Sequence, residues 1–154
     1  MALKAAAAAV DIAPVTMRFG LASLCALLVD DLRADACAIS RVLGDVLIQI
    51  AEHVPDGGTL NTGQGYLASD FPLTVEVLRD AVSRRVWTQD PQADPEEVRL
   101  LRQLGYDGLL MLPLVMQDGV WALVEVYRRG AGFSDVEASA GERMLGEAVA
   151  EAAA

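Results

Sequence analysis

The stretch that decides the fold is residues 105–128, GYDGLLMLPLVMQDGVWALVEVYR. It contains two apolar runs, 109–116 and 120–127. Between them lies the pair Asp118-Gly119, which favours a hairpin turn because glycine tolerates positive φ. Both runs are apolar on their two alternating faces, which is typical of strands covered on both sides. The sequence therefore predicts a central hairpin with one cover above it and another below.

The remaining chain supplies these covers. The predicted order is a helix, a hairpin around Gly44-Asp45, a glycine-rich loop, a helical piece, a short strand, a helix, the central hairpin and a final helix. The corresponding residues are 14–33, Ala36–Leu43 with Val46–His53, 54–65, 66–83, 85–88, 94–105, 105–128 and 135–152. Strands joined by hairpins, with helices inserted between them, indicate an α+β domain. We expect one domain over residues 14–152, preceded by a flexible or frayed extension, residues 1–13.

Composition limits the partners that this chain can have. It has 154 residues, 53% of them hydrophobic and 5% aromatic, and a net charge of −10 with a pI near 4.4. This charge disfavours nucleic acids and anionic membranes, which are bound mainly through Lys and Arg. No apolar run reaches the ~20 residues of a membrane span. The two cysteines, Cys25 and Cys37, lie in apolar surroundings and indicate buried thiols in the reducing cytoplasm.

Short polar patterns predict where the helices begin. Asp70 is a candidate N-cap ahead of Pro72. The spacings Asp94-x-x-Glu97 and Ser134-x-x-Glu137 match capping boxes. We interpret the acidic residues near 90–97 as a solvated helix start rather than a metal site, because they lack the alternation of a calcium loop. No nucleophile–base pair and no carboxylate pair stands out, so the sequence does not predict an enzyme.

Three segments, in order, resemble a pattern of GAF domains from bacterial signalling proteins: 65–74 (GYLASDFPLT), 87–97 (WTQDPQADPEE) and 104–114 (LGYDGLLMLPL). Glu125 matches the acidic position of that family's penultimate strand, and Phe133-Ser134 the start of its last helix. The resemblance implies a GAF/PAS-like central antiparallel sheet of five to six strands. It places the N- and C-terminal helices on one face, and short helices and loops over a cavity on the other.

The same resemblance implies a sensory or regulatory domain. Residues 65–83 and 90–105, here called the roof, would cover a cavity that takes a small molecule or partner. The terminal helices, 14–33 and 135–152, would form a homodimer. The alternative is a ligand-free structural module whose cavity is filled by side chains and which serves dimerisation alone.

Family ligands can be examined residue by residue. Bilin-binding GAF domains attach their chromophore through a cysteine of the roof, and residues 65–105 contain none. Haem requires an axial histidine, and the single histidine, His53, ends a predicted strand. The Asn-Lys-Phe-Asp-Glu signature of cyclic-nucleotide binders does not occur. We therefore expect no haem, bilin or cyclic nucleotide as cofactor.

The candidate cavity lining combines apolar side chains with a few polar groups, as ligand pockets do. Glu125 is its most informative member, because a carboxylate in so apolar a strand must be paired or hydrogen-bonded if it is buried. It either holds an amine or amide of a ligand or meets a group of the roof. The candidate residues are Tyr66, Phe71, Thr74, Leu78, Trp87, Leu101, Tyr106, Met111, Leu123 and Glu125.

Overall fold

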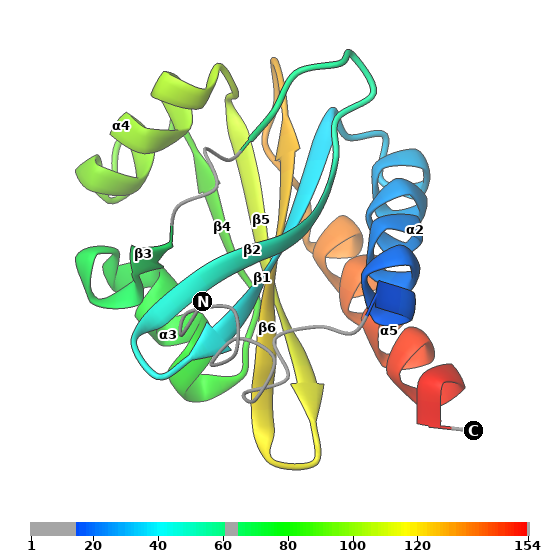
Figure 1. Cartoon of the computed structure of the whole chain (residues 1–154). Helices are drawn as coiled ribbons and strands as arrows, with labels where there is room; N and C mark the ends of the chain where they lie inside the picture. The colour runs from blue at the N-terminus through cyan, green and yellow to red at the C-terminus, as the bar shows by residue number, and fades with distance from the viewer. Residues whose placement is uncertain (1–14, 61–64, 154) are drawn as a thin grey trace, which may run out of the picture.

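The computed structural model describes residues 15–60 and 65–153, so the predicted extension of residues 1–13 lies outside the described part. The chain forms helices and strands in the order that the sequence predicts (Figure 1). Their bounds are α2 Val15–Asp31, β1 Ala36–Leu43, β2 Val46–His53, β3 Tyr66–Leu67, η1 Ala68–Asp70, α3 Pro72–Asp80, β4 Arg84–Trp87, α4 Pro95–Leu104, β5 Gly108–Met116, β6 Gly119–Arg128 and α5 Asp135–Ala153.

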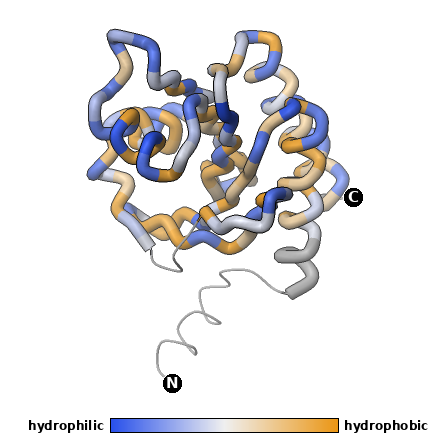
Figure 2. The backbone as a smooth tube through the Cα atoms, turned by 90° about the horizontal axis from the view of Figure 1, so that it is seen from above, coloured by the Kyte–Doolittle hydropathy of each residue, from blue (hydrophilic) through white to orange (hydrophobic). Residues whose placement is uncertain are grey.

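The strands form one six-stranded sheet in the order β3-β2-β1-β6-β5-β4, and all neighbours are antiparallel. The two hairpins meet in the middle, where β1 pairs with β6. Helices α2 and α5 cover one face, while η1, α3 and α4 cover the other (Figure 1). Figure 2, which views the molecule from above, again separates the terminal helices from the roof. The α+β architecture with opposed covers is therefore confirmed.

The central hairpin divides its side chains between two cores. On β5, Leu110 and Leu112 enter a core beneath the terminal helices, while Leu109 and Met111 enter a second core beneath the roof. Because side chains alternate along a strand, one apolar run serves both layers. We call these the helix-side core and the roof-side core. The prediction of a hairpin covered on both sides is confirmed.

Glycine makes both hairpin turns. Gly44 and Gly119 have φ values of +63° and +118°, a region that residues with a Cβ rarely adopt. The short strand predicted at 85–88 begins one residue earlier, at Arg84. The local turn chemistry thus places the ends of the long strands correctly.

The helix starts follow the sequence in two of three cases. Ser134 and Glu137 form a complete capping box, in which each side chain accepts a hydrogen bond from the other residue's backbone N–H, at 3.1 and 2.9 Å. Asp94 caps α4 by accepting from the Glu97 N–H at 3.1 Å. The expected cap by Asp70 is wrong, because residues 68–70 form a 3₁₀ turn and Phe71 stands at the N-cap without a side-chain bond.

The face beneath the terminal helices is apolar. Cys25 on α2 and Cys37 on β1 are fully buried free thiols, as expected. Burial, followed by contact with Cys25, raises the pKa of Cys37 well above its usual value. Among the helices of residues 15–60 and 65–153, none is long and apolar enough to cross a membrane.

Candidate functional site

Glu125 lies in the middle of β6, and its side chain enters the roof-side core. Its neighbours along this face of the strand are Leu123 and Tyr127, both buried. The carboxylate is 9% exposed, and its Oε1 accepts a hydrogen bond from Tyr66 Oη at 3.1 Å. Tyr127 makes a second side-chain hydrogen bond to it. The carboxylate thus connects the central strand to Tyr66, where the roof begins.

A second buried carboxylate comes from the roof itself. Glu97 belongs to the first turn of α4 and is only 3% exposed. Its Oε1 accepts a hydrogen bond from Thr74 Oγ1 of α3 at 3.3 Å. The Glu97 side chain therefore turns inward and does not reach back to complete the predicted capping box.

Thr74 links the two carboxylates through the sheet. Its hydroxyl lies 3.5 Å from the sulfur of Met111 on β5, and Met111 is the cross-strand partner of Glu125. Side chains of directly opposed residues are neighbours on a sheet. A buried cluster between α3, α4 and the sheet therefore contains both carboxylates, with the Thr74 hydroxyl and the Met111 sulfur between them.

No cation balances this group within residues 15–60 and 65–153, because none of the ion pairs there involves Glu97 or Glu125. Burial first, and then the charge of Glu125, raises the pKa of Glu97 to about 7. Burial also raises the pKa of Glu125, although hydrogen bonds from Tyr66 and Tyr127 oppose the increase. The pair thus holds a proton far more readily than exposed glutamates do.

The structure brings nine of the ten predicted lining residues together. Tyr66 bonds Glu125 and meets Phe71 edge to face, with ring centroids 5.8 Å apart. The remaining seven are buried in the roof-side core, pack against it or bond its members; they are Thr74, Leu78, Leu101, Tyr106, Met111, Leu123 and Glu125.

Trp87 is the tenth, and the structure separates it from the others. It is 45% exposed on β4, the strand at the edge of the sheet, and it packs against Gly132. Its neighbour Val86 is the residue of β4 that enters the roof-side core. Because side chains alternate along β4, Trp87 lies on the opposite face of the sheet from Val86. The prediction that Trp87 lines the cavity is therefore wrong.

Sequence reasoning missed Glu97 and Tyr127 as members of this group. A signal existed for both. Glu97 stands four residues before Leu101 and seven before Leu104, so it shares their helical face. Tyr127 stands two residues after Glu125, so it shares the same face of the strand. The two buried carboxylates thus come from α4 and β6, elements that no spacing in the sequence connects.

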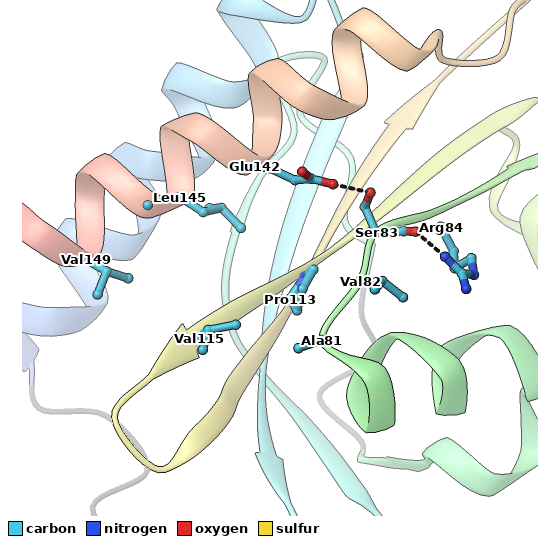
Figure 3. Close-up of a pocket in the computed structure, with 10 residues that line it drawn as sticks. Ala81, Val82, Ser83, Arg84, Pro113, Val115, Glu142, Leu145 and Val149 are labelled. Carbon is cyan, nitrogen blue, oxygen red and sulfur yellow. Dashed lines mark hydrogen bonds between the residues drawn. The ribbon is translucent and has the colours of Figure 1, made fainter.

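Two surface hollows lie away from this buried group. One, of about 440 Å³, lies between α5, β5 and the segment that joins α3 to β4. In Figure 3, Ser83 and Glu142 join across it by a hydrogen bond, with Leu145 beside them on α5. The other, of about 480 Å³, lies on the outer surface of α4 around Val98 and Arg102. Neither hollow reaches Glu125.

The arrangement of two terminal helices, a six-stranded sheet and a roof around a central carboxylate can be compared with known proteins. The family model for the GAF domain matches residues 21–154. This chain belongs to the GAF family. No curated protein matches it significantly in sequence.

Solved structures share the fold of this GAF domain at low sequence identity. The chromophore-binding domain of an unusual bacteriophytochrome from R. palustris has a TM-score of 0.72 at 12% identity; the match covers 88% of this chain and 55% of that one. The phycocyanobilin-bound GAF domain of a cyanobacterial phytochrome has a TM-score of 0.71 at 19% identity, covering 86% and 81%. A GAF domain/HD domain protein from Geobacter sulfurreducens has a TM-score of 0.67 at 17% identity, covering 86% and 89%. This GAF domain thus spans about half the length of the R. palustris chain.

These neighbours correct one expectation from the sequence. We expected no cofactor and set bilin aside, yet the fold matches the chromophore-binding domain of the R. palustris bacteriophytochrome and a phycocyanobilin-bound GAF domain. The expectation of no cofactor is therefore wrong, because domains of this fold bind bilins. The chain's two cysteines, Cys25 and Cys37, both lie in the helix-side core, across the sheet from Glu125.

Proposed function

We propose that this GAF domain is the sensory or regulatory module of a cytoplasmic bacterial signalling protein, without catalytic activity of its own. In this proposal it binds a small molecule between the roof and the sheet. The observation that carries the proposal is the buried carboxylate of Glu125, which contacts Tyr66 where the roof begins. Membership of the GAF family and the chromophore-bound neighbours support it.

The chemistry of the site favours a ligand that donates hydrogen bonds. Glu125 and Glu97 are acceptors when ionised, and no cation pairs with either of them in the described part of the chain. An N–H group of a ligand can replace Tyr66 at Glu125 and so change the contact between roof and sheet. A bilin fits this class through its pyrrole N–H groups; bound noncovalently, it would supply light absorption.

A thermal-shift experiment tests the proposal. The probes are biliverdin and a set of small amines and amides, with the full chain as receptor. A ligand that binds only the folded state raises the midpoint of unfolding, by roughly 3 °C or more when it is in large excess over its Kd. We expect such a shift for at least one probe, and its loss in Glu125→Gln. For biliverdin, a change in its absorption spectrum provides a second reading.

The control is Glu147→Gln, which removes an exposed carboxylate from α5 far from the roof. It should leave every shift unchanged. If no probe stabilises the wild-type chain, the alternative holds, and the module serves dimerisation with a filled interior. If Glu125→Gln retains the full shift, ligand binding does not use the carboxylate.

We also propose that the terminal helices form a homodimer. Leu27 on α2 is 56% exposed, and Val136 on α5 is 78% exposed. An exposed leucine offers apolar surface that a partner helix can remove from water. On that surface Ser23 lies one turn before Leu27 and Gly20 two turns before it, and these small residues allow close approach.

Sedimentation of the full chain tests this second proposal. We expect a dimer for the wild type and a monomer for Leu27→Glu, because a buried, unpaired charge at an interface is strongly unfavourable. Leu67→Glu is the matched control, since Leu67 is also exposed but lies on β3, on the opposite side of the molecule. A wild-type monomer at high concentration would contradict the proposal.

A further inference from the structure

Helix α4 packs on the molecule through one face only. Of its ten residues only Glu97 and Leu101 are buried. Val98 and Leu104 are partly buried against the roof-side core. The other side chains are exposed or half-buried, and Glu96 pairs with Arg99 on the outer surface. One of the two buried side chains of this helix is therefore a carboxyl group. The free-energy cost of burying a carboxyl group is much larger when it is charged than when it is neutral.

The surroundings of Glu97 contain acids and hydroxyl groups. Thr74 of α3 donates to it, Met111 of β5 lies beyond that hydroxyl, and Glu125 of β6 repels it. Asp94 at the start of α4 also repels the charge of Glu97. The charge of Glu97 in turn contributes to the raised pKa of Tyr66 on β3. Two further groups interact electrostatically with Glu125: Tyr127 on the same face of β6, and the thiol of Cys37 across the sheet. None of the groups named here is a cation.

We propose that the Glu97–Glu125 pair makes the docking of α4 depend on pH: a proton on the pair keeps α4 against the sheet, and ionisation of both carboxylates releases it. The neutral acid can stay buried beside Thr74, whereas two buried like charges repel each other and are compensated only by hydrogen bonds from Thr74, Tyr66 and Tyr127. The position of the Glu97 pKa, about 7, places this change near neutral pH. The roof would then respond to protons whether or not a ligand is present, so the inference is independent of the proposed function.

The direction follows from proton linkage. The pKa of Glu97 is raised in the folded state relative to its ordinary value of 4.5, so the folded state binds the proton more tightly. The stability that this proton provides is complete below about pH 4.5, declines as the pH rises and is lost once the pH has passed through about 7. Because α4 is a small unit with few buried contacts, it is expected to open locally before the whole domain unfolds.

Hydrogen exchange of the full chain tests the inference, with rates corrected for the intrinsic pH dependence of amide exchange. We expect the protection of α4 amides to fall by about tenfold between roughly pH 6 and pH 8.5. Amides of α5 serve as the internal reference and should change little. In Glu97→Gln the fall should disappear, and in Glu125→Gln it should become smaller because the repulsion is removed.

The matched control is Glu96→Gln, an exposed glutamate next to Glu97 on the same helix. It should behave as the wild type. Equal protection of α4 at both pH values in the wild type would overturn the inference. So would a full pH-dependent fall that persists in both Glu97→Gln and Glu125→Gln. If Glu97→Gln fails to fold, Glu125→Gln alone decides, because a fall as large as that of the wild type excludes the pair.

Discussion

Replacing Arg128 by Met is expected to lower the free energy of unfolding by about 3 kcal/mol, because it leaves several partly buried acceptors without their donor. Arg128 ends β6 with its side chain 12% exposed. It donates to the carbonyls of Gly132 and Leu32 and to both carboxylate oxygens of Glu137. One guanidinium thus joins the end of the central strand to the segment after α2 and to the first turn of α5.

Urea unfolding followed by circular dichroism measures this effect. Arg143→Met is the matched control, since Arg143 forms an exposed pair with Glu147 and should change stability by less than about 0.5 kcal/mol. Hydrogen bonds from Arg128 lower the pKa of Glu137 to about 2, so this acid stabilises the fold above pH 4.5 and ceases to do so as the pH falls through about 2. Arg128→Met should therefore also weaken the loss of stability in acid. Equal stability of the two variants would show that the network contributes little.

The second large effect is expected from Glu97→Gln, which should raise the free energy of unfolding at about pH 8 by roughly 2–3 kcal/mol. A carboxyl pKa that moves from 4.5 to about 7 corresponds to about 3 kcal/mol at full ionisation. Local opening of α4 limits the gain, because the opened helix returns the charge to water. Gln keeps an oxygen that can accept from Thr74 and carries no charge.

The same unfolding experiment is run at about pH 5 and pH 8. Wild-type stability should fall between them as Glu97 ionises, and Glu97→Gln should show a smaller fall. Glu96→Gln should follow the wild type, since its carboxylate is exposed. Wild-type stability that is equal at the two pH values would contradict the raised pKa.

The layers of this fold could be predicted because they depend on local chemistry. An Asp-Gly pair between two apolar runs specifies the central hairpin, and Gly44 does the same for the first hairpin. Strands that are apolar on both faces require two covers, and the helices available at the ends and in the middle of the chain provide them. The capping box of α5 likewise involves only neighbours in sequence.

The site could be predicted only in part, because its members come from different elements. Glu125 was found because a carboxylate in an apolar strand is conspicuous. Glu97 stands among other acids at a helix start, and only the docking of α4 shows which of them turns inward. Trp87 was misplaced because its direction depends on the register of β4 against β5, where Val86 faces Leu109. The two-residue strand β3 is too short to have a period of its own.

The pairing of β1 with β6 has a consequence for how the protein is made. Residues 36 and 127 are partners in the middle of the sheet, although most of the chain lies between them. On a ribosome, the first hairpin emerges long before its central neighbour and must wait with one edge unpaired. Contacts between such distant parts of a chain slow folding, since the loop between them must close first. The sheet can therefore be completed only after nearly the whole domain has been synthesised. A truncation that removes β6 takes away a central strand of the sheet and not an edge strand.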